Sequence, residues 1–238
     1  TMDRGRVNVH DWGGVAPAPK RTDLEPGQYT GWDDPRLPTL AGLRKRGIQA
    51  TALRQVWLEL GITQKDISVP LATLYSHNVS VIDKTAPRLA FVRHPAAFQL
   101  VGDYPKELAL PLHPNDATMG QRRWTLTNGE IWLESDDLDK MDLRLKEFAN
   151  IALHDREARV ESMERNDKRP IVHWLPTNNS KEAIITGTRD NTIFHIEGRL
   201  ERHKHKVGTI VQLERVGYAV VIDESTLTLC HEDLTDDL

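Results

Sequence analysis

The pattern of hydrophobic positions changes once along the chain, near residue 88. Before this point apolar side chains recur three and four positions apart, as in Leu53, Val56, Trp57 and Leu60, which is the spacing of one face of an α-helix. After it, short apolar runs alternate with turn residues, a pattern typical of β-strands. The sequence therefore predicts helices first and strands afterwards.

Three helices are expected in the first part. One ends at Gly47 after a cationic last turn, a second ends at Gly61, and a third begins near Pro70 and is closed by Pro87. Glycine and cations suit helix C-termini, and proline suits a first turn. The first helix carries Leu37, Leu40 and Leu43, and the second carries Leu53, Val56, Trp57 and Leu60 at helical spacing. The third is expected to bury one stripe, formed by Leu71, Leu74, Tyr75 and Ile82.

Short strands at regular spacing after residue 88 favour a barrel or a sandwich, and about 150 residues of this pattern are enough for two small barrels. We therefore expect an α+β fold, with a small helical bundle followed by two antiparallel β-barrels. A segment rich in Pro and Gly, residues 1–30, precedes the bundle (residues 31–88) and the two-barrel domain (residues 89–238). The expected strands are 89–92, 98–101, 130–133, 143–145, 170–175, 183–186, 192–196, 208–213, 218–222 and 226–229.

Composition narrows the functional classes. Of the 238 residues, 39% are hydrophobic and 28% are charged, as in soluble globular proteins. No window reaches the roughly 20 apolar residues of a membrane span, so we expect a cytoplasmic protein without a membrane partner. The net charge of −4 argues against a DNA-coating protein, and any nucleic-acid contact must come from local basic patches. The lone Cys230 excludes an internal disulfide.

Four segments carry a resemblance to a known family. They are Gly31–Leu40 with Leu43–Ile48, His113–Asn115 with Met119–Arg122 and Gly129–Trp132, Ile171–Pro176, and Val211–Tyr218. In this order they resemble the C-terminal, tRNA-binding half of archaeal-type glutamyl-tRNA synthetases, which are class I glutamyl/glutaminyl-tRNA synthetases. The resemblance implies a helical bundle that contacts the inside of the tRNA L, followed by barrels that bind the anticodon.

The resemblance implies tRNA as the partner and its recognition as the function. Leu74–Asn78 and Val81–Asp83 look closer to glutamyl enzymes, which favours tRNA-Glu. The His-Pro-Asn and Gly-Glu-Ile-Trp pieces are also at home in glutaminyl enzymes, which keeps tRNA-Gln open as the partner. ATP and Mg²⁺ are implied for the full-length enzyme and no cofactor for this chain. Two further hypotheses are a stand-alone tRNA-binding or docking module without ligase activity, and a split ligase completed by a separate N-terminal catalytic half.

The first candidate anticodon residues are Gln212, Glu214 and Arg215. Strand alternation places Gln212 and Glu214 on the face opposite Val211 and Leu213, and Arg215 begins a turn. A Gln amide and an Arg fork suit the edges of an unstacked base, although a solvated strand face with an Arg–Glu pair would show the same pattern. The resemblance places the Gln and the Arg at the anticodon.

Further cations are candidates for RNA contacts. The resemblance places Arg122 near the central anticodon base, and Arg123 adjoins it. Lys168 and Arg169 precede a predicted strand, where they would contact phosphate and position the RNA without specifying its sequence. The neighbouring residues expected to lie in the core are Trp124, His173 and Trp174.

The cations that end the first helix, Arg44, Lys45 and Arg46, are candidates for the inside of the tRNA L because of the resemblance. Cations that satisfy the C-terminus of a helix need no RNA, so a purely local role would explain them equally well.

A remnant of the catalytic signature loop is expected in residues 1–30. At the place of that loop the chain reads Val15–Arg21, in which Lys20 and Arg21 could face a phosphate. Its two prolines remove backbone donors that such a loop aims at an anion, and no ATP motif of the His-Ile-Gly-His type is found. We therefore expect no catalytic residue and no ligase activity from this chain alone. No metal site is expected, because Asp33–Asp34 and His203–His205 lack further ligands.

Overall fold

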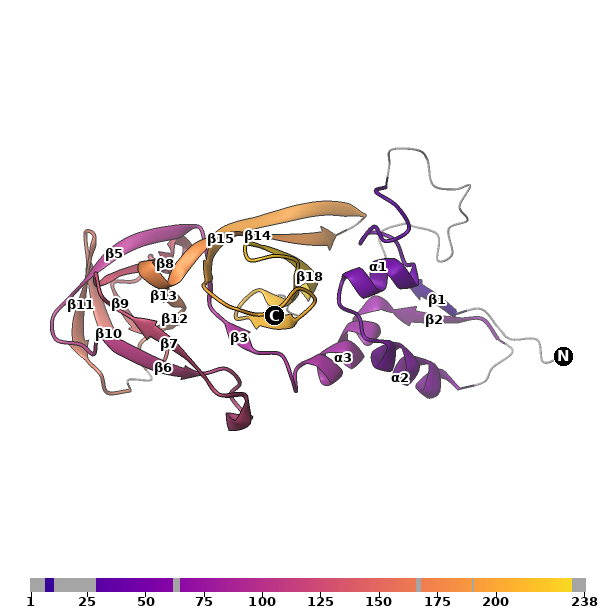
Figure 1. Cartoon of the computed structure of the whole chain (residues 1–238), viewed down its shortest axis with the longest axis horizontal. Helices are drawn as coiled ribbons and strands as arrows, with labels where there is room; N and C mark the ends of the chain where they lie inside the picture. Colours follow the sequence, from indigo (N-terminus) through magenta and orange to yellow (C-terminus); the bar gives the residue numbers. More distant parts are fainter. Residues whose placement is uncertain (1–6, 11–28, 62–64, 166–167, 190, 233–238) are drawn as a thin grey trace.

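The computed structural model describes residues 7–10, 29–61, 65–165, 168–189 and 191–232. They form an elongated molecule, with a helical part at one end and two curled, barrel-like sheets beyond it (Figure 1). The helices are α1 (Leu40–Lys45), α2 (Ala50–Leu60) and α3 (Leu71–Ile82). The predicted α+β class, with few helices and two barrels, is confirmed.

Local signals set the helix ends. Thr39 caps α1 by accepting a hydrogen bond from the Gly42 N–H at 2.9 Å, and Gly47 follows the helix with φ +76°. Gly61 ends α2 with φ +66°, and Pro70 precedes α3. A left-handed backbone conformation favours glycine, as found here at the C-terminal ends of α1 and α2. The three predicted helices are thus confirmed.

The buried faces of α1 and α2 differ from the predicted stripes. Leu37 lies before α1 and is fully buried, whereas Leu40, at the start of α1, is 75% exposed. On α2 the buried residues are Ala52 and Val56, and Trp57 is 56% exposed. Leu40 and Trp57 therefore belong to the apolar stripes of these helices but lie on parts of them that the described structure leaves exposed. Helical spacing marks a stripe of apolar residues, but the packing partners decide which part of the stripe is covered.

A short parallel pair completes the helical part. β1 (Val7–His10) pairs with β2 (Ile67–Pro70). Of the two, β1 lies within the Pro- and Gly-rich segment of residues 1–30, for which no strand was predicted. A parallel pair joins segments that are distant in sequence, so no local pattern reveals it. α3 ends at Ile82 and not, as predicted, at Pro87. The core of the helical part consists of Leu43, Ile48, Val56, Val69, Leu71 and Leu74.

Each barrel is a seven-stranded sheet. The strands of the first barrel are β5 (Pro95–Val101), β8 (Glu130–Glu134), β9 (Asp142–Leu145), β10 (Asn150–His154), β11 (Glu157–Ser162), β12 (Ile171–Val172) and β13 (Trp174–Pro176). The strands of the second barrel are β3 (Arg88–Leu89), β4 (Phe91–Arg93), β14 (Ser180–Arg189), β15 (Thr192–Glu201), β16 (Ile210–Leu213), β17 (Gly217–Val221) and β18 (Thr226–Glu232).

The strand order is β12-β9-β10-β11-β5-β8-β13 in the first barrel and β3-β16-β17-β18-β14-β15-β4 in the second. Most neighbours are antiparallel, as predicted, but β5–β11, β9–β12, β14–β18 and β3–β16 are parallel. The barrels are thus mixed sheets. Each has its own buried core, built largely from aliphatic side chains on the inward faces of its strands.

Each barrel is closed by one strand that is interrupted at a single residue. In the first barrel β12 pairs with β9 and β13 pairs with β8, and His173 separates the two pieces. In the second barrel β3 pairs with β16 and β4 with β15, and Ala90 separates them. A single strand thereby joins both edges of its sheet, which leaves few unpaired edge groups.

A two-stranded arm leaves the first barrel and reaches toward α3 (Figure 1). Its strands are β6 (Glu107–Pro111) and β7 (Gln121–Thr125). Between them, the Leu112 carbonyl accepts a hydrogen bond from the Arg88 N–H at 2.7 Å, and His113 Nε2 lies 2.8 Å from the Asp83 carbonyl oxygen. The arm therefore connects the first barrel to the second barrel and to the end of α3.

Every predicted strand overlaps an observed one, but β1, β2, β6, β7, β10 and β11 were missed. On the arm, Arg122 and Arg123 interrupt the apolar alternation because most of β7 is not buried. An exposed strand keeps its backbone pairing without keeping the hydrophobic pattern by which it could be found in the sequence.

Candidate nucleic-acid interface

A hollow of about 410 Å³ lies between the two barrels and the arm. We call it the interbarrel pocket. Both interruptions of the closing strands, Ala90 and His173, line it. Its remaining wall comes from the arm, from the turn after β9 and from the turn between β16 and β17. The residues with polar side chains on its wall are Arg88, Arg122, Lys146, Glu147, His173, Gln212, Glu214 and Arg215.

Gln212 lies on the wall formed by β16. Its neighbours Val211 and Leu213 are fully buried in the second barrel, so the predicted alternation is confirmed. The Gln212 N–H donates to the Pro87 carbonyl at 2.9 Å, which fixes the backbone. Its half-buried side-chain amide lines the pocket and makes no interaction with another side chain of the described residues. The amide thus offers both a donor and an acceptor to a ligand.

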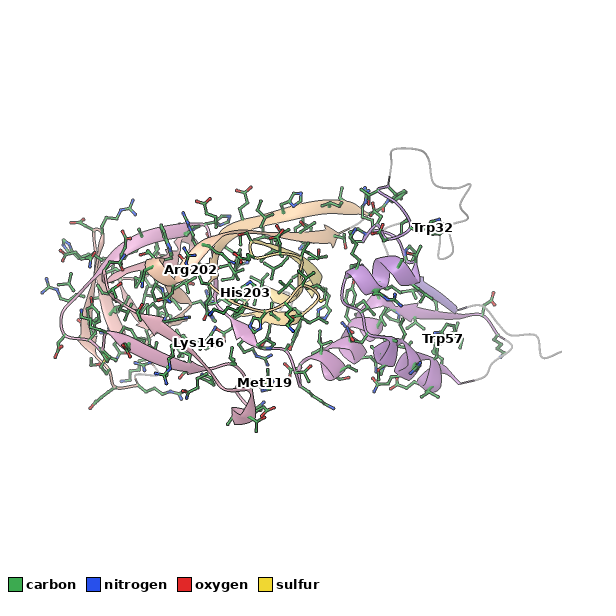
Figure 2. All side chains as sticks on the ribbon, in the orientation of Figure 1. Trp32, Trp57, Met119, Lys146, Arg202 and His203 are labelled. Atoms are coloured by element: carbon green, nitrogen blue, oxygen red, sulfur yellow. The ribbon has the colours of Figure 1, made fainter. Side chains whose placement is uncertain are left out.

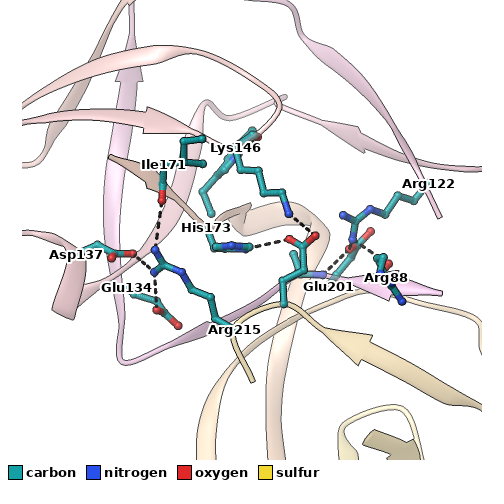
Figure 3. A network of polar contacts seen from close by, with 12 residues as sticks. Arg88, Arg122, Glu134, Asp137, Lys146, Ile171, His173, Glu201 and Arg215 are labelled. Atoms are coloured by element: carbon teal, nitrogen blue, oxygen red, sulfur yellow. Dashed lines mark hydrogen bonds and ion pairs between the residues drawn. The ribbon is translucent and has the colours of Figure 1, made fainter. Parts of the chain in front are cut away.

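Glu214 is held by the first barrel. Its carboxylate accepts hydrogen bonds from Lys146 Nζ at 2.5 Å and from His173 Nδ1 at 3.0 Å (Figure 3). Burial raises the pKa of Glu214, but the hydrogen bonds and charges of His173 and Lys146 outweigh it and lower the pKa to about 2. The carboxylate is therefore ionised at neutral pH and acts only as an acceptor.

Arg215 occupies the turn between β16 and β17 with φ +63°, an uncommon conformation for a residue other than glycine. Its Nη1 donates to Asp137 at 2.7 Å and lies 3.4 Å from Glu134, and its Nη2 donates to the Ile171 carbonyl at 3.3 Å (Figure 3). These three partners belong to the first barrel. Arg215 therefore lines the pocket and also ties the barrels together, a role beyond the predicted one.

Arg122 faces the pocket from the arm. Its Nη1 donates to Glu201 at 2.5 Å and to the Arg88 carbonyl at 3.0 Å, and its guanidinium lies 5.2 Å from the Trp124 ring centre. Its Nε is buried without a hydrogen-bond partner in the described structure. Arg123, one residue on, points to the opposite side of the arm and is exposed. The two arginines that the sequence treats as a pair are thus separated by the pleat of β7.

The other predicted cations lie away from the pocket. Arg169 pairs with Glu161 and lies 3.8 Å from Asp142, and Lys168 is exposed. Arg44 is exposed at the end of α1. Lys20 and Arg21 lie outside the described residues.

The rest of the α1 cluster has partners within the protein. Lys45 pairs with Asp33 at 3.0 Å. Arg46 is 4% exposed and donates to the Tyr75 hydroxyl and, at 3.2 Å, to the Cys230 carbonyl. It therefore joins α1 to α3 and the second barrel, and it is not accessible to a phosphate.

The sequence pointed to Gln212, Glu214, Arg215 and Arg122, and the structure brings all four to one pocket. It missed Lys146 and the buried Glu201, and it treated His173 only as a core residue. Trp124 and Trp174 are buried as expected, at 3% and 2% exposure. No local signal marks Lys146 or Glu201, because each is defined by a partner far along the chain.

Comparison with known proteins agrees with this geometry. Residues 86–166, which include the arm and much of the first barrel, match the family model described as "tRNA synthetases class I (E and Q), anti-codon binding domain". The chain contains this anticodon-binding domain. Arg122 and Lys146 of the pocket wall lie in the matched segment, whereas Gln212, Glu214 and Arg215 lie after it in the sequence.

The relatives of this anticodon-binding domain include archaeal glutamate–tRNA ligases. The chain is 33% identical to the ligase of Methanosarcina acetivorans over 92% of its own length and 39% of the relative. It is 34% identical to that of Archaeoglobus fulgidus over 93% of the chain and 40% of the relative. It is 37% identical to that of Methanococcus maripaludis over 83% of the chain and 37% of the relative. The chain thus spans about two-fifths of the length of these relatives.

Two features are absent from the described residues. None of their helices is long and apolar enough to cross a membrane. The same residues contain no group of three or more His, Cys, Asp or Glu side chains that could hold a metal ion.

Proposed function

We propose that this chain recognises tRNA-Glu and that the interbarrel pocket receives one unstacked base of the anticodon. The observation that carries the proposal is a base-sized hollow with unused hydrogen-bonding groups on its wall. The guanidinium of Arg122 lines this hollow, and the amide of Gln212 makes no interaction with another side chain of the described residues, so both can offer hydrogen bonds to a base edge. Sequence-specific recognition of RNA targets unstacked bases through such groups.

The charges of the pocket favour a base over a phosphate. Its cationic residues each have a carboxylate partner: Arg122 pairs with Glu201, Lys146 with Glu214, Arg215 with Asp137, and Arg88 with Asp83. A phosphate would have to compete with these carboxylates and would be repelled by them. A neutral base edge needs only donors and acceptors, which the wall supplies. Phosphate contacts are therefore assigned to exposed cations outside the pocket, among them Arg123 and Lys168.

Binding of tRNA transcripts measured by filter retention across salt concentrations tests this function. Tight binding to tRNA-Glu is expected, and replacement of an anticodon base should weaken it. Gln212→Ala should cost about 1–3 kcal/mol with tRNA-Glu and much less with the anticodon-substituted tRNA. Arg159→Ala serves as a control because this exposed residue lies on β11, at the end of the molecule away from the helices (Figure 1).

Equal affinity for tRNA-Glu and its anticodon variants at every salt concentration would contradict the proposal. Preference for tRNA-Gln would support recognition but would replace the glutamyl assignment with the glutaminyl one. The names of the archaeal relatives favour tRNA-Glu.

A second candidate function rests on the helical part. An apolar hollow of about 220 Å³ lies between α1, α2, α3 and the β1–β2 pair. Beside it Leu40, Trp57 and Leu58 are 75%, 56% and 80% exposed, and Trp57 projects from α2 away from the barrels (Figure 2). Exposed apolar clusters of this kind mark interaction sites. Because the chain spans only about two-fifths of its relatives, we propose that the remaining, catalytic half of a synthetase docks here.

Calorimetric titration with the separately produced N-terminal part of the Archaeoglobus fulgidus relative tests this docking. The double variant Leu40→Asp/Trp57→Asp should abolish binding, whereas Ile193→Asp, on the β14–β15 hairpin, should leave it intact. Absence of binding by the unmodified chain would exclude docking, and ATP–pyrophosphate exchange upon mixing would show a split ligase. The expectation that the chain alone is inactive, and that ATP serves only the full-length enzyme, stays a prediction.

A further inference from the structure

Two buried carboxylates lie where the barrels meet, Glu134 at the end of β8 and Glu201 at the end of β15. They are 2% and 3% exposed. A buried carboxylate is costly unless it is paired and fully hydrogen-bonded. Each accepts a backbone N–H from the β3–β4 closing strand and an arginine from the opposite side of the interface. Glu201 receives the arginine of the arm, and Glu134 receives Arg215 of the second barrel.

Glu201 has the closer set of donors. Its Oε2 accepts hydrogen bonds from the Ala90 N–H at 3.0 Å and from Arg122 Nη1 at 2.5 Å. Its Oε1 accepts a hydrogen bond from Trp124 Nε1 at 2.7 Å. The Glu201 N–H in turn donates to the Ala90 carbonyl at 3.0 Å. The carboxylate is therefore fixed by the interruption of the closing strand and by the indole of the arm.

These contacts determine how Arg122 faces the pocket. Its Nη1 is bound by Glu201 and by the Arg88 carbonyl, and its guanidinium lies above the Trp124 ring. A planar guanidinium held at one end and on one face has little freedom left. Its Nε is buried and has no hydrogen-bond partner among the described residues. Figure 3 shows Glu201 beside Arg122 and Arg88.

We infer that Glu201 is a positioning residue for base recognition, which holds the guanidinium of Arg122 at the wall of the interbarrel pocket, where it meets the base. The inference rests on the proposed function, since it assigns a task to a residue behind the pocket wall. Glu201 itself does not touch the base. Without the Glu201 carboxylate, the Arg122 side chain would be free to turn away from the pocket. Its charge would remain, but its donors would no longer be held in one orientation toward the base.

Glu134 provides a matched comparison. It is equally buried and also bridges the barrels, but its contact with Arg215 is long, at 3.4 Å. Arg215 keeps Asp137 at 2.7 Å and the Ile171 carbonyl at 3.3 Å when Glu134 is changed. Loss of the Glu134 charge should therefore disturb the contact between the barrels without releasing Arg215 from the pocket wall.

The test measures anticodon discrimination. Affinities for tRNA-Glu and for transcripts with each anticodon base replaced in turn are compared for the unmodified chain, Glu201→Gln, Arg122→Lys, the double variant and Glu134→Gln. Glu201→Gln keeps the shape but turns an amide N–H₂ toward groups that already donate. Arg122→Lys keeps the charge but has no fork that serves the carboxylate and the base together.

Glu201→Gln and Arg122→Lys should each lower discrimination on the order of tenfold at one and the same anticodon position. The double variant should be no worse than either single variant, because both remove one arrangement. Glu134→Gln should change discrimination by less than about threefold, within the range of an indirect effect. A merely structural role of Glu201 would weaken all transcripts alike and leave the ratio unchanged.

Two results would overturn the inference. One is a Glu201→Gln variant that discriminates between anticodons as well as the unmodified chain does, and the other is a double variant whose loss of discrimination equals the sum of the two single losses. If Glu201→Gln does not fold in urea titrations, Trp124→Phe decides, because it removes one donor to Glu201 and so loosens the carboxylate that holds Arg122, without replacing Arg122 itself. Discrimination should then fall at the same position, and an unchanged ratio would count against the inference. An unmodified chain without discrimination would instead refute the proposed function itself.

Discussion

At the scale of single residues, Glu214 shows how the pocket depends on charge. Its carboxylate joins a turn of the second barrel to Lys146 and His173 of the first. The depressed pKa, about 2 against an ordinary value of 4.5, means that the folded protein stabilises the ionised form. This stabilisation is fully present above the unfolded pKa, near 4.5, and is lost as the pH falls from there toward 2.

We therefore predict that Glu214→Gln lowers the free energy of unfolding at pH 7 and changes it progressively less between pH 4.5 and 2. The difference at pH 7 should be on the order of 3 kcal/mol at most. Urea unfolding at about pH 7, 4 and 3 measures it. As a control, Glu182→Gln removes an exposed pair with Arg199 and should have little effect at any pH. A Glu214→Gln deficit that persists unchanged at the lowest pH would argue against the ionised pair.

Residue patterns predicted which side chains on β16 face outward, because alternation along a strand is a local property. They left Arg46 among the RNA candidates, although it is buried against Tyr75 and the Cys230 carbonyl. A cation at the end of a helix looks the same in the sequence whether solvent or another element covers it. The partner from β18 decides, and it lies far along the chain.

At the scale of elements, the turn after α1 packs directly on the second barrel. Gly47 has φ +76°, and a Cβ there would lie 2.7 Å from both Cys230 Sγ and Val220 Cγ2. Burial raises the pKa of the Cys230 thiol to about 12, so the thiol is protonated and unreactive while this contact persists. The helix end is therefore set by tertiary packing as well as by glycine's freedom.

Gly47→Ala should destabilise the protein by about 2–4 kcal/mol, the sum of backbone strain and overpacking. Gly61→Ala is a matched control, because its φ is +66° and no atom of the described residues lies within 4 Å of the added Cβ. It should cost only about 1 kcal/mol. Urea unfolding gives both values. Labelling of Cys230 should begin at lower urea in Gly47→Ala than in Gly61→Ala, and equal costs would contradict the packing explanation.

Secondary structure followed the sequence where burial enforced a pattern. Strands that line the barrel cores, such as β14 and β17, have an apolar pattern that could be recognised in the sequence. Strand β7 of the arm has no such pattern, because most of it is not buried. The interruptions at Ala90 and His173 were invisible for a related reason. A strand that changes neighbours keeps one continuous apolar run, and only the paired strands show where it breaks.

At the scale of the whole molecule, both this protein and its proposed tRNA partner are acidic. The net charge is −4, and the pocket arginines are neutralised by their own carboxylates. Affinity from phosphates must then come from exposed cations such as Arg123, on the outer side of the arm. In the proposed complex, one side of β7 recognises the base and the other contacts phosphate.

Arg123→Ala should weaken tRNA-Glu and its anticodon variants by the same factor and reduce the salt slope of binding by about one. The discrimination ratio should stay at the wild-type value, in contrast to Arg122→Lys. Filter retention at salt concentrations between about 50 and 200 mM measures both quantities. A change of discrimination in Arg123→Ala would show that the outer side of the arm also reads bases.

The sequence by itself determined the kinds of elements, their order and the outward face of β16, because periodicity, glycine and proline act over a few residues. It also carried the four segments that resemble the synthetase family. Only the tertiary structure decided which cations face the pocket, since Arg122, Arg215 and Arg46 owe their orientation to Glu201, Asp137 and Tyr75. Those partners lie on other elements, and it is the packing of the two barrels against each other that brings them within hydrogen-bonding distance.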